Sequence, residues 1–397
     1  MKKIIIAGCG FAGFAAAIEL KRLTGVECEI EVISDQPLYV YSPALPAIPF
    51  GMREPDDISF DVRPVLAGHG IGFRHERVVR VDPVNRIVET SASNHSYDYL
   101  LVALGPAPER MTPPGLGAAR TSWSIISLDD ALKAREAWNQ FVLAPGPMVI
   151  GAAEGAPLYA AHYQFALNAV ADLEARGIRE KVDIHFLTPE AKLGHFGAGG
   201  AVDSELLAER LFARHGIQCR TDARIAEVRD DRVILGSGEE LPTAFTMVMP
   251  RFIGTDAVRA SKGLADALAQ IEVTAECRHP DFPNIFAAGL ATTFRSNDAT
   301  VVSGGLPMTI YPAERMAMLV AANIASFIHG GQVMEISFDD LAQRCASDAR
   351  QMIDRAITGG IPQRRSQEVL QGGSPTNRAR AHFEQRLLTA RQDGEIQ

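Results

Sequence analysis

The stretch KIIIAGCGFAG, residues 3–13, decides the fold. Its apolar run 3–7 predicts a buried strand, and residues 14–23 predict a helix. The glycines between them have the GxGxxG spacing of a dinucleotide-binding turn. The first allows a tight turn, the second lets the backbone approach a pyrophosphate, and the third lets helix and strand pack closely. With the free amides of the helix N-terminus, the expected binding residues are Gly8, Gly10, Phe11, Ala12 and Gly13.

The next strand, predicted over residues 29–33, should end in a side chain that accepts hydrogen bonds from a ribose. Ser34 occupies the expected position and Asp35 follows it, so the ribose ligand is open between these two. Cys9 lies within the glycine turn, where we interpret it as a small side chain tolerated beside glycines. The first forty residues therefore predict dinucleotide binding.

The length of 397 residues exceeds the roughly 250–300 at which a single hydrophobic core stops growing, so several domains are expected. With 47% hydrophobic and 22% charged residues, the chain can fill several cores, which excludes a largely disordered protein. The net charge of −9 argues against a nucleic-acid partner, because phosphate binding requires a basic face.

The five cysteines contain no close pair, so neither a disulfide framework nor a zinc site is readable and no metal is expected. The N-terminus leads directly into the first strand without a signal peptide, and no run of about 18 apolar residues occurs. These features favour a cytoplasmic protein. Peripheral binding at the inner face of the membrane is the alternative.

Two later strands, predicted over 97–106 and 284–290, end in small residues that let a cofactor approach the backbone. A helix predicted over 309–329 follows the second of them, and its N-terminal amides are suited to stabilising negative charge. The cofactor contacts expected from these segments are Ala103, Leu104, Gly105, Gly289, Leu290, Met308 and Thr309.

Residues 147–156 repeat the strand-and-glycine design, and a helix follows to about Arg176. The repeat lacks the middle glycine, because Ala153 stands there. Glu154 also places a carboxylate where a phosphate would lie, and like charges repel. We therefore predict a second Rossmann-like unit that does not bind NAD(P)H.

Together these stretches resemble the two-dinucleotide-fold flavoproteins, and within them the sulfide:quinone oxidoreductases and the flavoprotein subunit of flavocytochrome c sulfide dehydrogenase. The matching segments are 8–13, 39–43, 97–106, 146–155, 192–197, 284–291 and 308–323. The resemblance implies FAD as cofactor. It also implies an α/β fold with two Rossmann-like domains of the glutathione-reductase type and a short C-terminal helical region. The implied units are an FAD-binding domain in two parts, a second Rossmann-like domain and a C-terminal region, at 1–115 with 251–330, 116–250 and 331–397.

Relatives in this family oxidise sulfide with cysteines beside the flavin. Leu158 and Ile126 stand where two of those cysteines are expected, and only Cys345 matches, so the cysteine relay is incomplete. His195 is retained and can exchange a proton near neutral pH. The resemblance thus points to Cys345 and His195 as catalytic residues. The alternatives are a helix cysteine packed as a small hydrophobe and a surface histidine without a role.

The C-terminus bears on the electron acceptor. Quinone-reducing relatives end in aromatic amphipathic helices that lie on the membrane. Residues 361–397 contain one aromatic residue, Phe383, among many arginines. Membrane association is therefore expected to be weak or absent. The oligomeric state stays open, a homodimer included.

The first functional hypothesis is FAD-dependent oxidation of sulfide or another small sulfur compound, with a quinone or a redox protein as acceptor. The second is an NAD(P)H-dependent flavin reductase, which the second glycine turn disfavours. The third is an FAD-binding scaffold or regulatory subunit, which the loss of two cysteines favours. Oxidation of a carbon substrate in a pocket lined by Leu158, Tyr159 and His162 is a further alternative.

Overall fold

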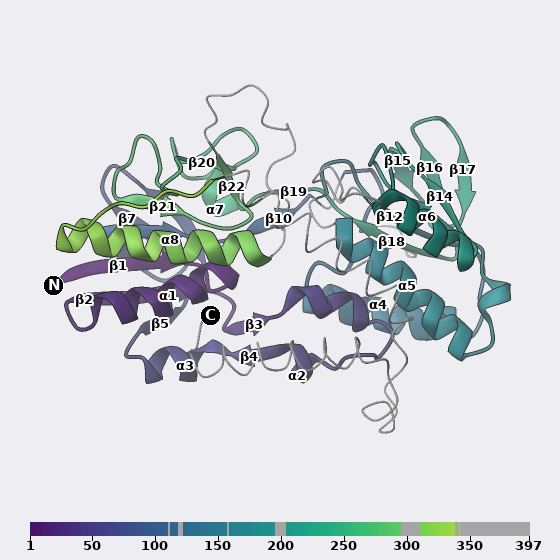
Figure 1. Ribbon diagram of the computed structural model, residues 1–397, viewed down its shortest axis with the longest axis horizontal. Coiled ribbons are helices and arrows are strands. Elements are labelled where there is room, and N and C mark those ends of the chain that lie inside the picture. The colour runs from purple at the N-terminus through teal and green to yellow at the C-terminus, as the bar shows by residue number, and fades with distance from the viewer. Residues whose placement is uncertain are drawn as a thin grey trace.

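Two lobes, each built on a five-stranded parallel sheet, make up the molecule (Figure 1). The structure is a computed structural model, and it describes residues 1–109, 112–117, 122–156, 159–194, 204–294, 310–337 and 341.

The first lobe contains a sheet of strand order β21-β9-β1-β2-β5. All its neighbouring strands are parallel. Parallel sheets are covered on both faces, so their strands are continuous apolar runs, and Ile4 to Ile6 are fully buried. The strands are β1 (Lys2–Ala7), β2 (Cys28–Ser34), β5 (Gly72–His75), β9 (Tyr99–Val102) and β21 (Ile285–Ala287).

Helices α1 (Phe11–Thr24) and α8 (Ile310–His329) pack against each other in the first lobe. Figure 1 shows them side by side, with both N-terminal ends towards the second lobe. α1 ends at Gly25, whose φ of 56° is readily adopted by glycine. The shorter helices of this lobe are α2 (Pro55–Ile58), α3 (Val62–Gly68), α7 (Asp256–Arg259) and the 3-10 helix η1 (Ser42–Ala47).

Four small sheets complete the first lobe and its connections. Three of them have two strands each: β3 (Leu38–Val40) with β4 (Ser59–Asp61), β10 (Pro106–Pro108) with β19 (Phe252–Gly254), and β20 (Ile271–Val273) with β22 (Thr292–Phe294). The fourth is antiparallel and comprises β6 (Val78–Asp82), β7 (Ile87–Thr90) and β8 (Asn94–Ser96).

The second lobe contains a parallel sheet of strand order β11-β18-β12-β13-β14, followed by a three-stranded antiparallel sheet. The parallel strands are β11 (Ser122–Trp123), β12 (Met148–Ala152), β13 (Ile184–Leu187), β14 (Ile217–Arg220) and β18 (Phe245–Met249). The antiparallel strands are β15 (Ile225–Val228), β16 (Arg232–Leu235) and β17 (Glu240–Pro242). The helices are α4 (Leu128–Phe141), α5 (Tyr159–Ala175), η2 (Arg179–Lys181) and α6 (Ser204–Arg214).

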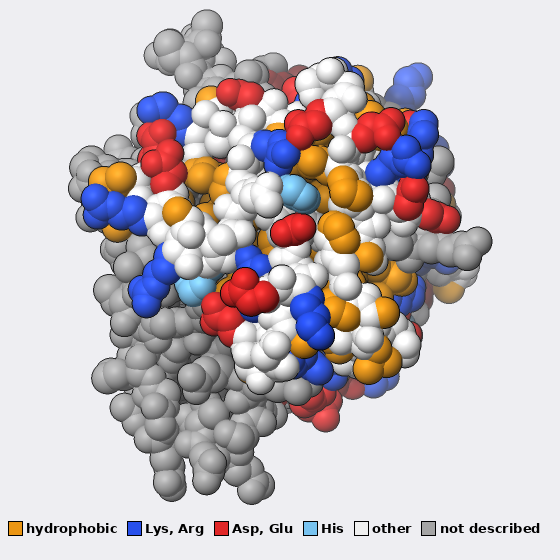
Figure 2. All heavy atoms as spheres, turned by 90° about the vertical axis from the view of Figure 1, so that its right-hand side faces the viewer, with side chains coloured by type: hydrophobic (Ala, Val, Ile, Leu, Met, Phe, Trp, Pro, Cys, Tyr) orange, Lys and Arg blue, Asp and Glu red, His pale blue; other side chains and the backbone are white. Residues whose placement is uncertain are grey.

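The outer face of the second lobe carries both signs of charge. Figure 2 shows acidic and basic side chains interspersed on this face. Charged side chains of this lobe form ion pairs, such as Arg220 with Glu239 at 2.7 Å and Arg232 with Glu240 at 2.8 Å. The described residues of this face form no single-sign patch of the kind that binds a phosphate backbone.

One arginine fixes the second lobe to the first. Arg135 of α4 donates to the carbonyls of Ile48 and Arg53, each at 2.7 Å, and pairs with Glu54 at 2.8 Å. Asn168 of α5 adds a hydrogen bond to the Pro46 carbonyl at 2.9 Å. The segment around η1 is therefore held between the lobes.

The α/β class with two Rossmann-like units is confirmed. Helix α1 begins three residues before the predicted start, because Gly10 serves as its N-cap and its carbonyl accepts from the Phe14 amide at 2.9 Å. The sheet of β6, β7 and β8 was absent from the prediction, because its short strands carry charged residues between the apolar ones. Apart from residues 331–337 and 341, the predicted C-terminal region 331–397 lies outside the described residues, and the domain boundaries stay predictions.

Asp172→Ala is expected to lower the free energy of unfolding by about 2–4 kcal/mol. The Asp172 carboxylate accepts from the buried Trp138 indole at 2.8 Å and from Arg176 at 2.5 Å, so both donors lose their acceptor. Chemical denaturation measures the change. Asp129→Ala, which removes an exposed pair with Lys133, is the control and should cost less than about 1 kcal/mol. Equal effects of the two substitutions would contradict this account.

Candidate functional site

The carboxyl ends of four neighbouring strands reach the same level in the first lobe. Ala7 of β1 pairs with Ile33 of β2 and with Val102 of β9, and Val102 pairs with Ala287 of β21. Ligands of open parallel sheets bind beyond the carboxyl ends of the strands. The segments singled out in the sequence, after β1, β2, β9 and β21, therefore meet at one place.

Gly8 and Gly13 are required by close packing within the turn. Gly8 has φ +99°, and a Cβ there would lie 2.3 Å from the carbonyl oxygen of Ala103. A Cβ at Gly13 would lie 2.0 Å from the carbonyl oxygen of Gly8. Neither position accepts a side chain without movement of the backbone, so these two glycines hold the shape of the turn.

Gly10 differs from the other two glycines, because a Cβ there would meet no atom of the described residues within 4 Å. The open space lies at the N-terminus of α1, where the amides of Phe11, Ala12 and Gly13 have no acceptor within the helix. The first turn contains no acidic residue. Space, free donors and the positive end of the helix dipole together suit a pyrophosphate.

The two candidates at the end of β2 have different surroundings. The Ser34 hydroxyl is buried and exchanges hydrogen bonds with the backbone of Gln36, at 3.0 and 3.1 Å. Asp35 is exposed, and no residue in the described part of the chain hydrogen-bonds its carboxylate. The structure therefore favours Asp35 as the ribose ligand.

The exit of β9 and the end of β21 border the glycine turn. The Ala103 amide donates to the Ala7 carbonyl at 2.8 Å, and the Ala288 amide donates to the Val102 carbonyl at 3.2 Å. Gly289 has φ +94°, and a Cβ there would lie 3.6 Å from the Ala12 Cβ. Leu104, Gly105 and Leu290 are partly exposed at the same edge.

Several predicted site residues lie outside the described residues. They are Leu158, His195, Met308, Thr309 and Cys345. Ile126, the other position where a cysteine was expected, is half-buried and packs against the hydrophobic core. His162, named for a carbon-substrate pocket, is fully buried and stacks on Phe186 with ring centroids 4.6 Å apart, so it does not line an open site.

Side chains of both signs of charge lie at the second glycine turn. Glu154 is exposed within the turn, and Arg251 packs on Gly155, with side-chain atoms 3.3 Å from where a Cβ would lie. After β13, the carboxylate of Glu190 is buried and accepts from Tyr163 at 2.8 Å and Thr188 at 2.7 Å. The Glu190 carboxylate is thus already bound by hydroxyl groups of the protein.

Arg251 was missed in the sequence. It places a cation beside the second turn, and its nearest acid is Glu109 at 3.9 Å. The available signal was its position: it stands two residues beyond the buried strand Phe245–Met249, at the carboxyl end of a parallel sheet.

The four described cysteines have free thiols whose pKa values are raised. Burial raises the pKa of Cys9 to about 12 and also raises the pKa values of Cys28 and Cys277. Burial raises the pKa of the half-buried Cys219 to about 12 as well. The interpretation of Cys9 as a small packed side chain agrees with this environment.

Known proteins resemble this chain over most of its length. A family model described as pyridine nucleotide-disulphide oxidoreductase matches residues 2–317. A sulfide-quinone reductase of Aquifex aeolicus is 35% identical over 335 residues, which cover 82% of this chain and 77% of the relative. An NADH dehydrogenase-like protein of Mycobacterium tuberculosis is 28% identical over 325 residues, covering 75% of this chain and 74% of the relative.

A solved structure shows the same similarity. The sulfide:quinone oxidoreductase from Aquifex aeolicus superposes with a TM-score of 0.78 at 34% sequence identity, covering 83% of this chain and 78% of that chain. The sequence comparison and the structural comparison therefore identify the same kind of relative.

Gly10→Ala should weaken dinucleotide binding by roughly tenfold to a hundredfold, because the new methyl group occupies the space left for the pyrophosphate. The unfolding free energy of the cofactor-free protein should change by less than about 1 kcal/mol. Fluorescence titration of the cofactor-free protein with FAD measures affinity, and denaturation measures stability.

Gly8→Ala is the matched control, because its Cβ meets the backbone of Ala103 instead of open space. It should destabilise the cofactor-free protein by about 2 kcal/mol or more. If Gly10→Ala retains full affinity, the pyrophosphate does not lie at this turn.

Native alkylation at pH 8 should leave Cys9, Cys28 and Cys277 unmodified. A thiol with a pKa of about 12, as for Cys9, is only about one part in ten thousand thiolate at that pH. Peptide mass spectrometry with iodoacetamide, before and after denaturation, measures the difference. Rapid native labelling of any of the three would contradict their burial.

Proposed function

The chain belongs to the pyridine nucleotide-disulphide oxidoreductase family, and we propose that it uses FAD to oxidise sulfide or another small sulfur compound. Two electrons leave the sulfur and pass to a quinone or a redox-protein acceptor. The single observation that carries the proposal is the open cradle at Gly10, in a chain that is 35% identical to a sulfide-quinone reductase.

The residues of the first lobe fit the cofactor. The turn from Gly8 to Gly13 would hold the pyrophosphate with the free amides of α1, and Asp35 would accept from the ribose hydroxyls. The segments 103–105 and 289–290 would border the flavin. When bound, FAD supplies a two-electron acceptor. No attachment residue is marked in the sequence, so we propose noncovalent binding.

Cys345 is the proposed sulfur-binding residue, because it is the remaining cysteine at a position where relatives place one. Formation of a bond between its thiolate and the donor sulfur would release two electrons, for which bound FAD would be the acceptor, and one proton, which His195 would accept near neutral pH. The buried, high-pKa thiols of Cys9 and Cys277 do not offer a substitute. A single nucleophile is thus proposed where a pair is usual.

The second lobe supports a donor other than NAD(P)H. The exposed carboxylate of Glu154 would repel a phosphate, and Ala153 is buried, with its amide bonded to the Met249 carbonyl at 2.8 Å. These contacts weigh against the NAD(P)H-dependent reductase, although an NADH dehydrogenase-like protein is among the relatives.

The place of the protein in the cell is part of the proposal. In the described part of the chain, every helix is too short or too polar to cross a membrane. We propose a cytoplasmic protein that associates with the inner face of the membrane weakly or not at all.

Anaerobic addition of sulfide to the purified holoprotein should bleach the visible flavin absorbance. Cys345→Ser should slow the bleaching by on the order of tenfold or more, because the serine hydroxyl is a much weaker nucleophile. Stopped-flow absorbance measures the rates. Cys219→Ser, a substitution in the second lobe, is the matched control and should leave them unchanged.

The same instrument distinguishes the alternatives. Bleaching by NADH or NADPH on the seconds scale, with none by sulfide, would identify a pyridine-nucleotide-dependent reductase. A flavin that neither donor reduces would favour the FAD-binding scaffold.

A further inference from the structure

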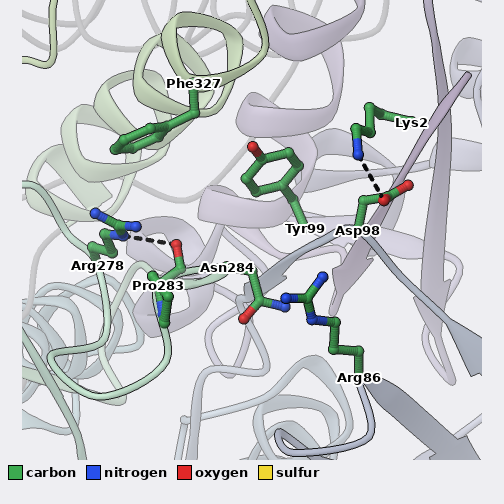
Figure 3. Close-up of a pocket in the computed structure, with 8 residues that line it drawn as sticks. All are labelled: Lys2, Arg86, Asp98, Tyr99, Arg278, Pro283, Asn284 and Phe327. Atoms are coloured by element: carbon green, nitrogen blue, oxygen red, sulfur yellow. Dashed lines mark hydrogen bonds and ion pairs between the residues drawn. The ribbon is translucent and has the colours of Figure 1, made fainter.

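A surface pocket of about 220 Å³ opens at the amino end of the first sheet. Its lining comes from the starts of β1, β9 and β21, from the turn between β6 and β7, and from α8 (Figure 3). The residues are Lys2, Arg86, Asp98, Tyr99, Arg278, Pro283, Asn284 and Phe327. The cofactor cradle lies at the carboxyl ends of the same strands, so the pocket is a separate place on the lobe.

The pocket lining has an excess of positive charge: Lys2, Arg86 and Arg278 against Asp98. Asp98 is already engaged, because its two oxygens accept from the Lys2 ammonium at 3.1 Å and from the Lys3 amide at 2.8 Å. These hydrogen bonds, the backbone one foremost, lower the pKa of Asp98. The carboxylate therefore remains charged and neutralises Lys2, which leaves the two arginines.

The arginines are fixed to different extents. Arg278 donates through Nε to the Pro283 carbonyl at 2.7 Å, and its guanidinium lies 4.5 Å from the centre of the Phe327 ring. Among the described residues, the nearest acid is Glu276, whose carboxylate is 3.9 Å away. Arg86 is exposed, and no acidic side chain in the described part of the chain pairs with it. The pocket thus presents one oriented and one unpaired guanidinium.

Asn284 adds a buried polar group that lacks a partner. The residue is 9% exposed, and its Nδ2 is buried without an acceptor. Figure 3 shows this amide nitrogen facing the Arg86 guanidinium, so that a donor meets a donor. Rotation of the amide by a half-turn would let Oδ1 accept from Arg86 and so orient that guanidinium.

We propose that this pocket binds a tetrahedral oxyanion, in particular inorganic phosphate or the phosphate group of a small soluble molecule. Arg86 and Arg278 supply donors from separate sides of the pocket, which suits an anion with several oxygens. The volume is below the roughly 300–1,000 Å³ of pockets for drug-sized ligands, so a small group fits best.

Calorimetric titration of the flavin-bound, full-length protein with sodium phosphate tests the proposal. Against a sodium chloride titration of equal ionic strength, we expect saturable binding of one phosphate per chain. Arg86→Gln should weaken that binding by roughly tenfold, because it removes a charged donor. Arg77→Gln removes an exposed charge from the same lobe outside the pocket and should change the affinity less than twofold.

Sulfate and acetate test whether the pocket prefers a tetrahedral anion. Sulfate should compete with phosphate, and acetate, which has two oxygens in a plane, should bind at least roughly tenfold more weakly. The proposal is overturned if phosphate shows no saturable binding above chloride, if acetate equals phosphate, or if the two arginine variants lose affinity equally. None of these results depends on the electron donor, so the phosphate proposal can fail or succeed independently of the sulfide experiment.

Discussion

The backbone of Gly8 lies against the Ala103 carbonyl, so close that even a methyl group would stand 2.3 Å from that oxygen. This contact joins the exit of β1 to the exit of β9, and Gly13 in turn rests on the Gly8 carbonyl. The beginning of α1 is placed by these contacts. Because α8 packs on α1, the C-terminal part of the first lobe depends on the same turn.

Residues distant in the chain share one cradle because of the register of the parallel strands. Parallel strands end at a common edge, and the register of β1 with β2 and β9, and of β9 with β21, is continuous. A cofactor placed there touches segments from the first forty residues and from the neighbourhood of Gly289. The second lobe reuses the architecture, with Glu154 and Arg251 at its turn instead of open space.

Local signals in the sequence were enough to predict the two sheets and the glycine turn. Apolar runs bounded by glycine mark parallel strands, and the spacing from Gly8 to Gly13 specifies the turn. The hydrogen-bond partners of side chains could not be predicted from the sequence. Nothing near Ser34, for example, indicates that its hydroxyl bonds the Gln36 backbone. The pocket at the amino edge was also unpredictable, because Arg86, Arg278 and Asn284 are brought together only by folding.

The hydrogen bonds that Arg135 and Asn168 form between the lobes bear on how this sequence can diverge. Arg135 and Asn168 hold the segment around η1 largely through the carbonyls of Pro46, Ile48 and Arg53. Every residue type supplies a carbonyl, so the side chains of this segment can change without loss of these bonds. The buried side chains of this segment are constrained by packing, as Phe50 is against Trp138, so variation is expected at its partly exposed positions, such as Ser42 and Ala47, while the lobes keep their relative position.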